Sequence, residues 1–130
     1  MIEKKIRANL LKFDIVDLMN IMFPKDCNID IPTIIPITYP DRDCIVGHVS
    51  AKRDDTGIVI EGLIEMNDEM NCLFSDKDVY VGGQYYVHEF YKNSEGIRMI
   101  KSANLTSMGL FEDDIYGDKT TLLKEVKEDD

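Results

Sequence analysis

The segment Arg53-Asp-Asp-Thr-Gly57 joins two apolar stretches, Cys44-Ile-Val-Gly-His-Val-Ser-Ala-Lys52 and Ile58-Val-Ile-Glu-Gly-Leu-Ile-Glu-Met66. The second stretch is rich in β-branched residues, which favour strands. The joining segment carries aspartate and glycine where a tight turn needs them. Two strands connected by so short a loop form a β-hairpin. We therefore expect a hairpin over residues 44–66, and this hairpin makes the chain a β-rich domain.

Two more strands and a short helix are predicted after the hairpin. Residues 67–78 favour one short helix, because apolar side chains fall at i, i+3 and i+4: Met70, Leu73 and Phe74. Residues 79–90 and 97–110 have the pattern of strands, and residues 93–96 form the turn between them. The pair Gly82–Gly83 lies inside the first of these strands, which indicates a bulge or a close backbone approach.

The chain before the hairpin is predicted to contain a helix. Residues 2–12 are ambiguous, because apolar residues recur there at helical spacing while a first barrel strand is also possible. Residues 14–23 favour a helix, with Asp14 as its N-cap, Asp17 near its positive end and Pro24 after it. The helix would carry more apolar side chains than one buried face requires: Ile15, Val16, Leu18, Met19, Ile21, Met22 and Phe23.

A proline-rich arm follows over residues 24–43, which hold all 4 prolines of the chain. Proline at this density excludes a central strand and favours extended edge segments, which can lie on a neighbour at a low entropic cost. We predict that residues 15–37 supply much of the contact with a partner, through Leu18, Met19, Met22, Phe23, Ile34 and Ile35. The alternative is that the helix only plugs the open end of a barrel. Serine at both Ile34 and Ile35 is expected to leave folding intact.

Length and composition bound the organisation of the chain. With 130 residues, 44% apolar and 31% charged, it has the size and composition of a single folded domain. We expect this domain to span residues 1–120, with the helix and the arm in residues 1–43 and the β-rich core in residues 44–111. The acidic residues 121–130 are predicted to be a solvated tail, with a turn of helix where it begins.

The charge of the chain is strongly one-sided. It has 25 acidic and 15 basic residues, which gives a net charge of −10. Such a surface repels phosphate, so direct binding of nucleic acid is disfavoured, whereas a basic protein is a suitable partner. The N-terminal residues lack the apolar run of a secretory signal, and no apolar stretch has the length of a membrane span. We therefore expect a cytoplasmic product.

No pattern in the sequence predicts a metal or a cofactor. The cysteines Cys27, Cys44 and Cys72 form no CxxC pair, so free thiols in a reducing compartment are expected. Acidic pairs occur in several predicted turns, but none has the ligand spacing of a calcium loop. Pairing of Cys72 with His48 or His88 is the arrangement that would make the chain a peptidase.

Four phrases of the chain, in this order, resemble a known family. They are Pro36-Ile-Thr-Tyr-Pro-Asp-Arg-Asp-Cys-Ile-Val-Gly-His-Val49, Asp54-Asp-Thr-Gly-Ile-Val-Ile-Glu-Gly-Leu-Ile64, Val79-Tyr-Val-Gly-Gly-Gln-Tyr-Tyr-Val87 and Ile97-Arg-Met-Ile-Lys-Ser-Ala-Asn-Leu-Thr-Ser-Met-Gly-Leu-Phe111. Their order and spacing resemble those of the prohead (capsid-maturation) serine proteases of tailed bacteriophages, over a little more than half of the chain.

The resemblance implies that the catalytic groups of that family are missing here. The histidine of the family falls at Pro40 or Asp41, its nucleophilic serine at the pair Gly82–Gly83, and its acidic residue at Thr106 or Ser107. Glycine has no side chain, so no acyl-enzyme can form there. Neither proline nor aspartate replaces histidine as a neutral base. We therefore expect a homologue with no catalytic residues, which hydrolyses no peptide bond.

The resemblance also implies a fold and a function. The expected fold is α+β, a small, mostly antiparallel β-barrel or sheet of the protease-like, assemblin type, with two or three short helices. The expected function is that of a non-enzymatic phage virion protein, an auxiliary or minor capsid component that braces or decorates the major capsid protein lattice.

The partner would be that capsid protein or another virion protein, with no nucleic acid, membrane, small-molecule substrate, metal or cofactor. The chain would be made in the cytoplasm of the bacterial host and end in the virion. Two alternatives from other classes stay open. One is an active prohead peptidase with displaced catalytic groups, and the other is a soluble acidic adaptor or inhibitor that binds a basic protein.

Overall fold

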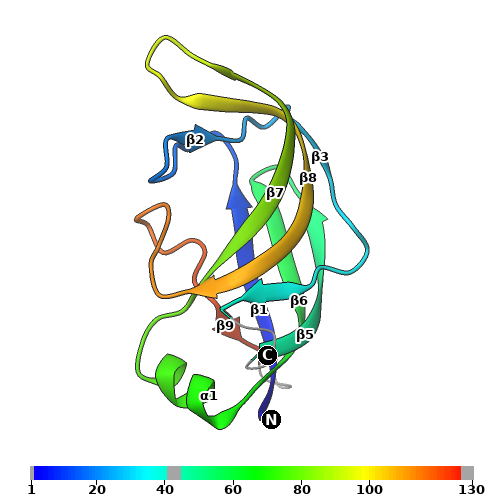
Figure 1. Cartoon of the computed structure of the whole chain (residues 1–130), viewed down its shortest axis with the longest axis vertical. Helices are drawn as coiled ribbons and strands as arrows, with labels where there is room; N and C mark the ends of the chain where they lie inside the picture. Colours follow the sequence, from blue (N-terminus) through cyan, green and yellow to red (C-terminus); the bar gives the residue numbers. More distant parts are fainter. Residues whose placement is uncertain (1, 41–44, 127–130) are drawn as a thin grey trace.

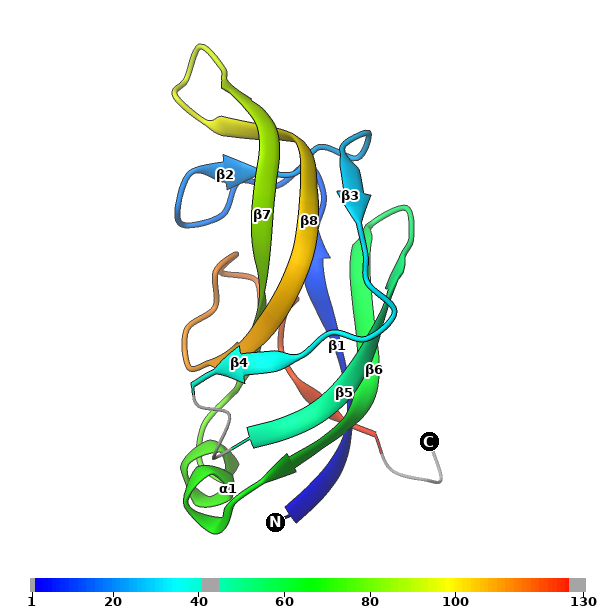
Figure 2. The same ribbon diagram turned by 45° about the vertical axis from the view of Figure 1, so that its right-hand side comes forward.

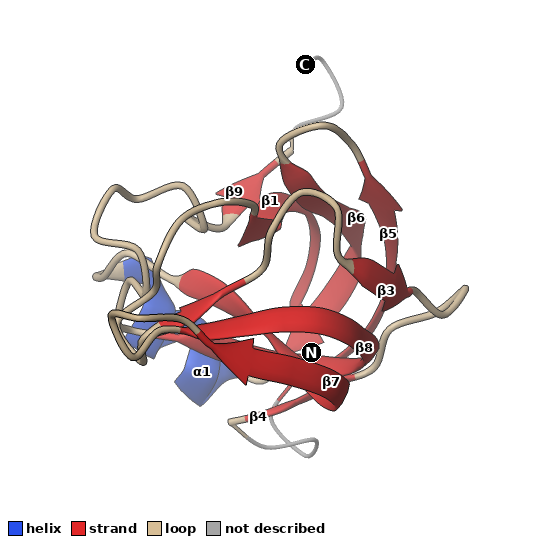
Figure 3. Cartoon of the chain, turned by 90° about the horizontal axis from the view of Figure 1, so that it is seen from above, coloured by secondary structure: helices blue, strands red, loops and turns tan. Residues whose placement is uncertain are grey.

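The structure, a computed structural model, describes residues 2–40 and 45–126, and only the backbone of Val46. The described elements form two sheets that face each other around a shared apolar core (Figure 1 and Figure 3). The first sheet has the order β5-β6-β1-β9 and is antiparallel throughout. Its strands are β1 (Ile2–Lys12), β5 (Ile45–Arg53), β6 (Gly57–Met66) and β9 (Lys124–Glu125).

The predicted hairpin is confirmed from residue 45 onward, since Cys44 lies outside the described residues. β5 and β6 pair in register from Ile45 opposite Met66 to Arg53 opposite Ile58. The Asp54 carboxylate forms the turn, because its Oδ1 accepts from the backbone N–H groups of Thr56 at 2.7 Å and Gly57 at 2.9 Å. The Thr56 bonds are the main reason that the pKa of Asp54 lies below its usual value.

The ambiguous residues 2–12 form a strand, β1, which pairs along the whole length of β6. Ile6, Ala8 and Leu10 are buried while the residues between them are exposed, which is the alternation of a half-buried strand. The local sequence also favours a helix, because Ile2, Ile6 and Leu10 recur at intervals of four residues. The edge of β6 decides the outcome, because a strand there satisfies both backbones and buries these side chains together.

The second sheet is built on one long central strand, β8 (Arg98–Phe111). β7 (Tyr80–Lys92) pairs antiparallel along one edge of β8. On the other edge three short segments pair parallel to β8 one after another: β2 (Ile21–Met22), β3 (Asn28–Asp30) and β4 (Ile37–Tyr39) (Figure 2). Two of these segments, β3 and β4, belong to the proline-rich arm, so its described part, residues 24–40, supplies extended edge segments as its composition predicted; residues 41–43 of the arm lie outside the described residues.

The predicted fold class is wrong in two respects. The structure is 57% strand and 7% helical, and within the described residues it has one helix, not the two or three expected of an α+β fold. The four predicted strands do not close into a barrel either. β5 and β6 lie in one sheet and β7 and β8 in the other, and the arm pairs parallel to β8, not antiparallel.

The predicted helix over residues 14–23 is absent, and the segment forms a turn that leads into β2. Asp14 and Asn20 have positive φ angles of 63° and 59°, which interrupt a right-handed helix. The Asp17 carboxylate accepts from the N–H groups of Met19 at 2.8 Å and Ile21 at 3.1 Å. Side chains of aspartate and asparagine that bond nearby backbone groups compete with helix formation, and in this segment the Asp17 bonds stabilise a turn in place of the helix.

The predicted short helix is confirmed as α1 (Asp68–Ser75). Asn67 caps it, with its side-chain oxygen accepting from Met70 N at 2.8 Å, and Met70 is buried. The predicted turn of helix near residue 120 is wrong, because residues 124–125 form β9 against β1. None of the helices that the structure describes has the length and apolarity to span a membrane.

Candidate functional site

Parts of the three phrases that hold the family's catalytic positions meet at one place, where β4, β8 and β7 lie side by side, whereas Gly47-His48-Val49 of the first phrase lies on β5 in the other sheet (Figure 2). Across β8, Tyr39 is opposite Gly109, Gly83 is opposite Met108 and Gln84 is opposite Ser107. The structure therefore brings together Pro40, the glycine pair and Ser107. Asp41, the other candidate for the family's histidine position, lies outside the described residues.

The polar side chains at this meeting point bond to one another. Thr38 Oγ1 lies 3.1 Å from Gln84 Oε1 and 3.2 Å from Ser107 Oγ. The Ser107 hydroxyl also donates to Gln84 Oε1, and Ser107 is buried. An amide oxygen is a poor proton acceptor, so this network gives Ser107 no general base. The arrangement ties β4, β8 and β7 together and offers no nucleophile.

Packing accounts for the glycine at the position of the nucleophile. A Cβ at Gly82 would lie 2.9 Å from the ring of Phe111, and one at Gly109 would lie 2.7 Å from Tyr39 Cβ. The rings of Tyr39 and Phe111 stack with centroids 4.7 Å apart. The paired glycines of β7 and β8 therefore leave room for an aromatic stack on the sheet.

The alternative peptidase arrangement finds no support in the geometry. Cys72 is exposed on α1, whereas His48 lies on β5 and His88 on β7. No hydrogen bond links Cys72 to either histidine in the described part of the chain. Cys27 is buried, and this burial is the main reason that the pKa of its thiol is raised. Residues 2–40 and 45–126 contain no cluster of three or more metal-ligating side chains.

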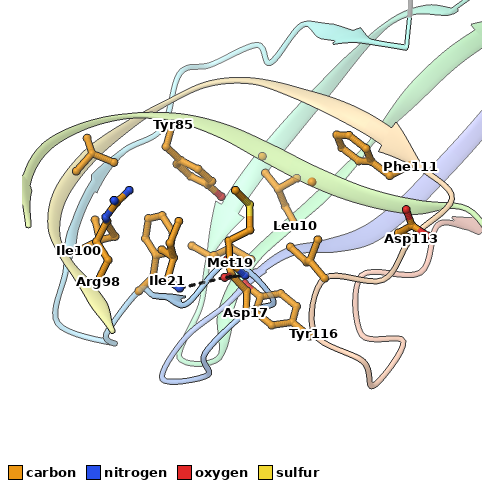
Figure 4. Close-up of a pocket in the computed structure, with 16 residues that line it drawn as sticks. Leu10, Asp17, Met19, Ile21, Tyr85, Arg98, Ile100, Phe111, Asp113 and Tyr116 are labelled. Carbon is orange, nitrogen blue, oxygen red and sulfur yellow. Dashed lines mark hydrogen bonds between the residues drawn. The ribbon is translucent and has the colours of Figure 1, made fainter. Parts of the chain in front are cut away.

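The feature best suited to bind something is a hollow of about 540 Å³ beside β7, which we call the groove (Figure 4). Strands β1, β7 and β8 and the two loops over residues 14–20 and 112–119 surround it. Its lining is mostly apolar: Leu10, Leu11, Met19, Ile21, Phe23, Gly82, Gly83, Tyr85, Val87, Ile100, Phe111, Ile115 and Tyr116, with Asp17, Arg98 and Asp113 as the charged members.

Backbone bonds fix the two loops that form the outer wall of the groove. Leu18 N donates to Ile115 O at 3.0 Å, which joins one loop to the other. Lys12 N donates to the Tyr116 hydroxyl at 3.3 Å, which joins the second loop to β1. Burial is the main reason that the pKa of Tyr116 is raised to about 12, so this hydroxyl stays protonated at neutral pH. The outer wall of the groove is therefore held in place by hydrogen bonds within the chain itself.

Tyr85 carries an unpaired hydroxyl in the opposite wall. Its oxygen is buried and has no hydrogen-bond partner among the described residues. The ring packs on Phe23, with centroids 4.8 Å apart, and the hydroxyl lies over Gly83, where a Cβ would approach it to 2.6 Å. Desolvation raises the pKa of Tyr85 far above its usual value, so the group is a neutral donor. A buried donor without an acceptor is destabilising.

The charged residues of the groove stand at separate places. Arg98 and Asp113 lie at opposite ends in Figure 4, and Asp17 lies between them on the outer lip. The guanidinium of Arg98 covers the ring of Phe90 at 5.0 Å. Asp113 is exposed, and one oxygen of Asp17 already holds its own loop. The two carboxylates thus give the loop side of the groove a negative charge.

The edge of β7 that borders the groove is unpaired for most of its length. At its start this edge is occupied, because Val81 N donates to Thr121 O at 2.9 Å and Leu123 N donates to Val79 O at 2.7 Å. Beyond the isolated bridge at Tyr80, none of the described strands pairs with this side of β7. An exposed strand edge of this kind is a template for another strand.

Alternation along the strand shows which backbone groups face the groove. The Val81 N–H points away from β8. The register shift after Gln84 leaves out Thr106 of β8 and no residue of β7, so alternation continues along residues 81–87, and the N–H and C=O groups of Gly83, Tyr85 and Val87 point away from β8 as well. The Thr106 hydroxyl donates to the Gln84 carbonyl at 3.0 Å, which places that carbonyl on the β8 side as alternation requires. Gly83, Tyr85 and Val87 also line the groove.

The predicted contact residues are divided among three environments. Leu18 and Met19 are each 75% exposed on the loop beside the groove, and Met19 lines it. Ile34 is 56% exposed, but it is not among the residues that line the groove. Met22 is half-buried, and two members are buried in the core: Phe23 and Ile35.

Sequence reasoning missed three residues that line the groove, which are Gly83, Tyr85 and Tyr116. One signal was present. Gly83 and Tyr85 are two residues apart on a predicted strand, so they share a face, and an aromatic ring commonly covers a glycine in that position. Comparison with protein-family models, with curated proteins and with solved structures finds no match for this chain.

Proposed function

We propose that the chain is a non-enzymatic structural protein of a phage virion, an auxiliary or minor capsid component that binds the major capsid protein or another virion protein. The observation that carries this proposal is the packed junction of β4, β8 and β7. There the glycines support an aromatic stack, and Ser107 bonds to Gln84 and Thr38. A protease-like phrase order without a nucleophile–base pair favours a binding role.

The surface supports binding of a protein. Leu18 and Met19 expose apolar side chains next to a groove with an apolar lining. Exposed apolar patches of this kind mark interaction sites in soluble proteins. The net charge of −10 favours association with a basic protein and opposes contact with phosphate. A place in the virion follows from the resemblance to the capsid-maturation proteases, and synthesis in the bacterial host follows with it.

The test of this proposal is mass spectrometry of purified phage particles from the source of the chain. The polypeptide is expected at a fixed copy number relative to the major capsid protein, and it should remain after washes that remove loosely bound protein. Its absence from particles, with recovery in a soluble complex with another protein, would contradict the virion role and support an adaptor.

A second measurement addresses catalysis. The purified chain is expected to take up no fluorophosphonate probe and to leave capsid and scaffold proteins uncleaved. Labelling of one serine, lost when that serine is replaced by alanine, would show an active peptidase. Rapid alkylation of Cys72 at low pH would show an activated thiolate, which an exposed cysteine without a base does not provide.

A further inference from the structure

We propose that the groove binds an extended segment of a basic partner protein, which adds as a strand to the free edge of β7. This inference rests on the proposed function only in that the chain binds a protein. It names the binding element, residues 83–87, and the chemistry of the segment that fits there. The segment is extended, has apolar side chains on one face and carries lysine or arginine.

The backbone of β7 argues for a polypeptide as the occupant. Gly83, Tyr85 and Val87 direct N–H and C=O groups away from β8, and no described strand pairs with them. Main-chain bonds of an added strand satisfy such groups, which is the basis of β-augmentation. A small apolar molecule fills the groove but leaves the row of donors and acceptors unpaired.

The lining of the groove suits the side chains of such a strand. Successive side chains of a strand point to opposite faces, so every second one faces the groove. There they meet Leu10, Ile21 and Ile100, all apolar. The added backbone also passes beside Gly83, where the unpaired Tyr85 hydroxyl lies. A main-chain carbonyl of the added strand is the acceptor that this buried donor lacks.

The charge of the groove and of the whole chain indicates what kind of protein supplies the segment. Asp17 and Asp113 stand on the loop side of the groove, and the whole chain carries −10. A second copy of this chain brings the same charge and is repelled, whereas a basic segment is attracted. Lysine and arginine also lay their apolar stems along apolar surface while the charge reaches a carboxylate. Arg98, at the other end, leaves a place for one acceptor of the partner.

The experiment begins with a library of displayed random peptides, selected on the immobilised full-length chain. The peptides have roughly seven residues, which at about 3.3 Å per residue covers the free edge over residues 83–87 and extends about one residue beyond it at each end. Enriched sequences are expected to alternate apolar and polar residues and to carry lysine or arginine. Enrichment of acidic or non-alternating sequences, or no enrichment above a bare surface, overturns the proposal.

A backbone probe then separates strand addition from simple apolar contact. The enriched peptide is made a second time with N-methyl groups on alternate residues of one edge, and a third time with N-methyl groups on the other edge. Methylation of the edge that faces β7 is expected to weaken binding by about tenfold or more, and methylation of the other edge much less. Equal effects of the two, or no effect of either, contradict strand addition.

A double variant and its matched control place the site. Asp17→Asn with Asp113→Asn removes two carboxylates of the groove and keeps an amide oxygen to hold the loop, whereas Asp26→Asn with Asp30→Asn removes two exposed carboxylates elsewhere. Affinity for the enriched peptide is expected to fall about tenfold in the first variant and little in the second. Equal losses of affinity in the variant and its control would show an effect of net charge alone and would contradict binding at the groove.

Tyr85→Phe separates a role of the Tyr85 hydroxyl in binding from a role in stability. It removes the unpaired hydroxyl, so the free chain is expected to melt at the same or a higher temperature, while the peptide binds several-fold more weakly. Unchanged affinity shows that the hydroxyl finds no acceptor in the complex and contradicts this part of the proposal. A lower melting temperature contradicts the unpaired state of the hydroxyl.

Failure of this inference is distinguishable from failure of the proposed function. A chain that is found in particles, and whose groove variants assemble into them normally, supports the virion role and removes the groove from it. A chain that is absent from particles, yet selects alternating basic peptides through β7, supports the groove and removes the virion role.

Discussion

The two sheets meet at two places, and the two junctions differ. At the junction of β4 and β5 the arm closes the gap, because Ile35 N donates to Val49 O at 3.0 Å and both side chains are buried. At the junction of β1 and β7, residues 121–126 bridge only one end, where Val81 N donates to Thr121 O and Val126 N donates to Lys5 O; beyond that end no described strands pair, and loops form a wall around a hollow of about 540 Å³. The chain therefore closes one side of its core with its own backbone and leaves a strand edge free on the other.

The difference follows from the residues that reach each junction. The arm alternates proline with isoleucine, so it is extended, donates few N–H groups and places Ile35 and Ile37 in the core. The loops at the open junction are rich in aspartate, glycine and asparagine, which bond their own backbone. A loop that satisfies itself does not pair with β7, so the edge remains available.

The closed junction should be the more sensitive to substitution. Ile35 has 0% exposure, so Ile35→Ser is expected to lower the free energy of unfolding by about 3–5 kcal/mol, from lost burial and a buried hydroxyl. Ile34→Ser is the matched control, because Ile34 is 56% exposed, and it should change stability by no more than about 0.5 kcal/mol. The burial of Ile35 therefore opposes the prediction from sequence that both substitutions leave folding intact. Urea denaturation of the two variants measures the difference, and similar losses would remove the contrast.

At the open junction, the Asp17 turn is expected to matter less. Asp17→Ala removes the acceptor of the N–H groups of Met19 and Ile21 and should cost about 1–2 kcal/mol. Asp17→Asn keeps an acceptor and should cost clearly less. Denaturation of the wild type and the two variants checks this order. A loss as large as that of Ile35→Ser would mean that the loops, and not the arm, hold the sheets together.

Tyr85→Phe should act in the opposite direction. Removing a buried hydroxyl that has no partner in the described chain is expected to raise the free energy of unfolding by about 1 kcal/mol. Tyr116→Phe is the matched control, because the Tyr116 hydroxyl accepts from Lys12 N at 3.3 Å, and it should lower stability. Thermal melts of both variants measure whether each substitution raises or lowers stability. A change in the same direction in both would contradict the assignment of the Tyr85 hydroxyl as unpaired and the Tyr116 hydroxyl as bonded.

The smallest expected effect concerns the ion pair that ties the second loop to β1. Lys12 Nζ lies 2.5 Å from Asp118 Oδ2, and this contact is the main reason that the pKa of Asp118 is lowered to about 2. The pKa in the unfolded chain is about 3.9, so the stabilisation is complete above that pH and disappears as the pH falls toward 2. Because Asp118 is exposed, it amounts to a few tenths of a kcal/mol. Melting temperatures of the wild type and Asp118→Asn should differ at pH 6 and converge near pH 2, and a constant difference would contradict the sign.

The parts of the fold that local chemistry decides were predictable from the sequence. The turn at Asp54 forms the hairpin, and Asn67 begins α1 where the predicted short helix lies. The strands β7 and β8 follow from their composition and from the turn at Asn93, whose side chain accepts from Glu95 N and Ile97 N.

The rest depends on pairing between distant segments. Residues 2–12 have helical spacing and become a strand because β6 offers an edge. Residues 15–23 are apolar enough for a helix, but Asp17 bonds the backbone and prevents it. The free edge of β7 depends on which strands are missing beside it, and neither composition nor periodicity reports that. Of the six predicted contact residues, Met19 and the buried Phe23 line the groove, and Leu18 is exposed beside it.

Amide hydrogen exchange along β7 tests the open edge most directly. The N–H groups of Gly83, Tyr85 and Val87 face away from β8 and should exchange at least about tenfold faster than those of Gly82, Gln84 and Tyr86, which face it. A basic, strand-forming peptide should protect the first set and leave the second unchanged. Uniform slow exchange along residues 82–87 of the free chain would show that the edge is already paired, and would contradict the open junction on which the binding role depends.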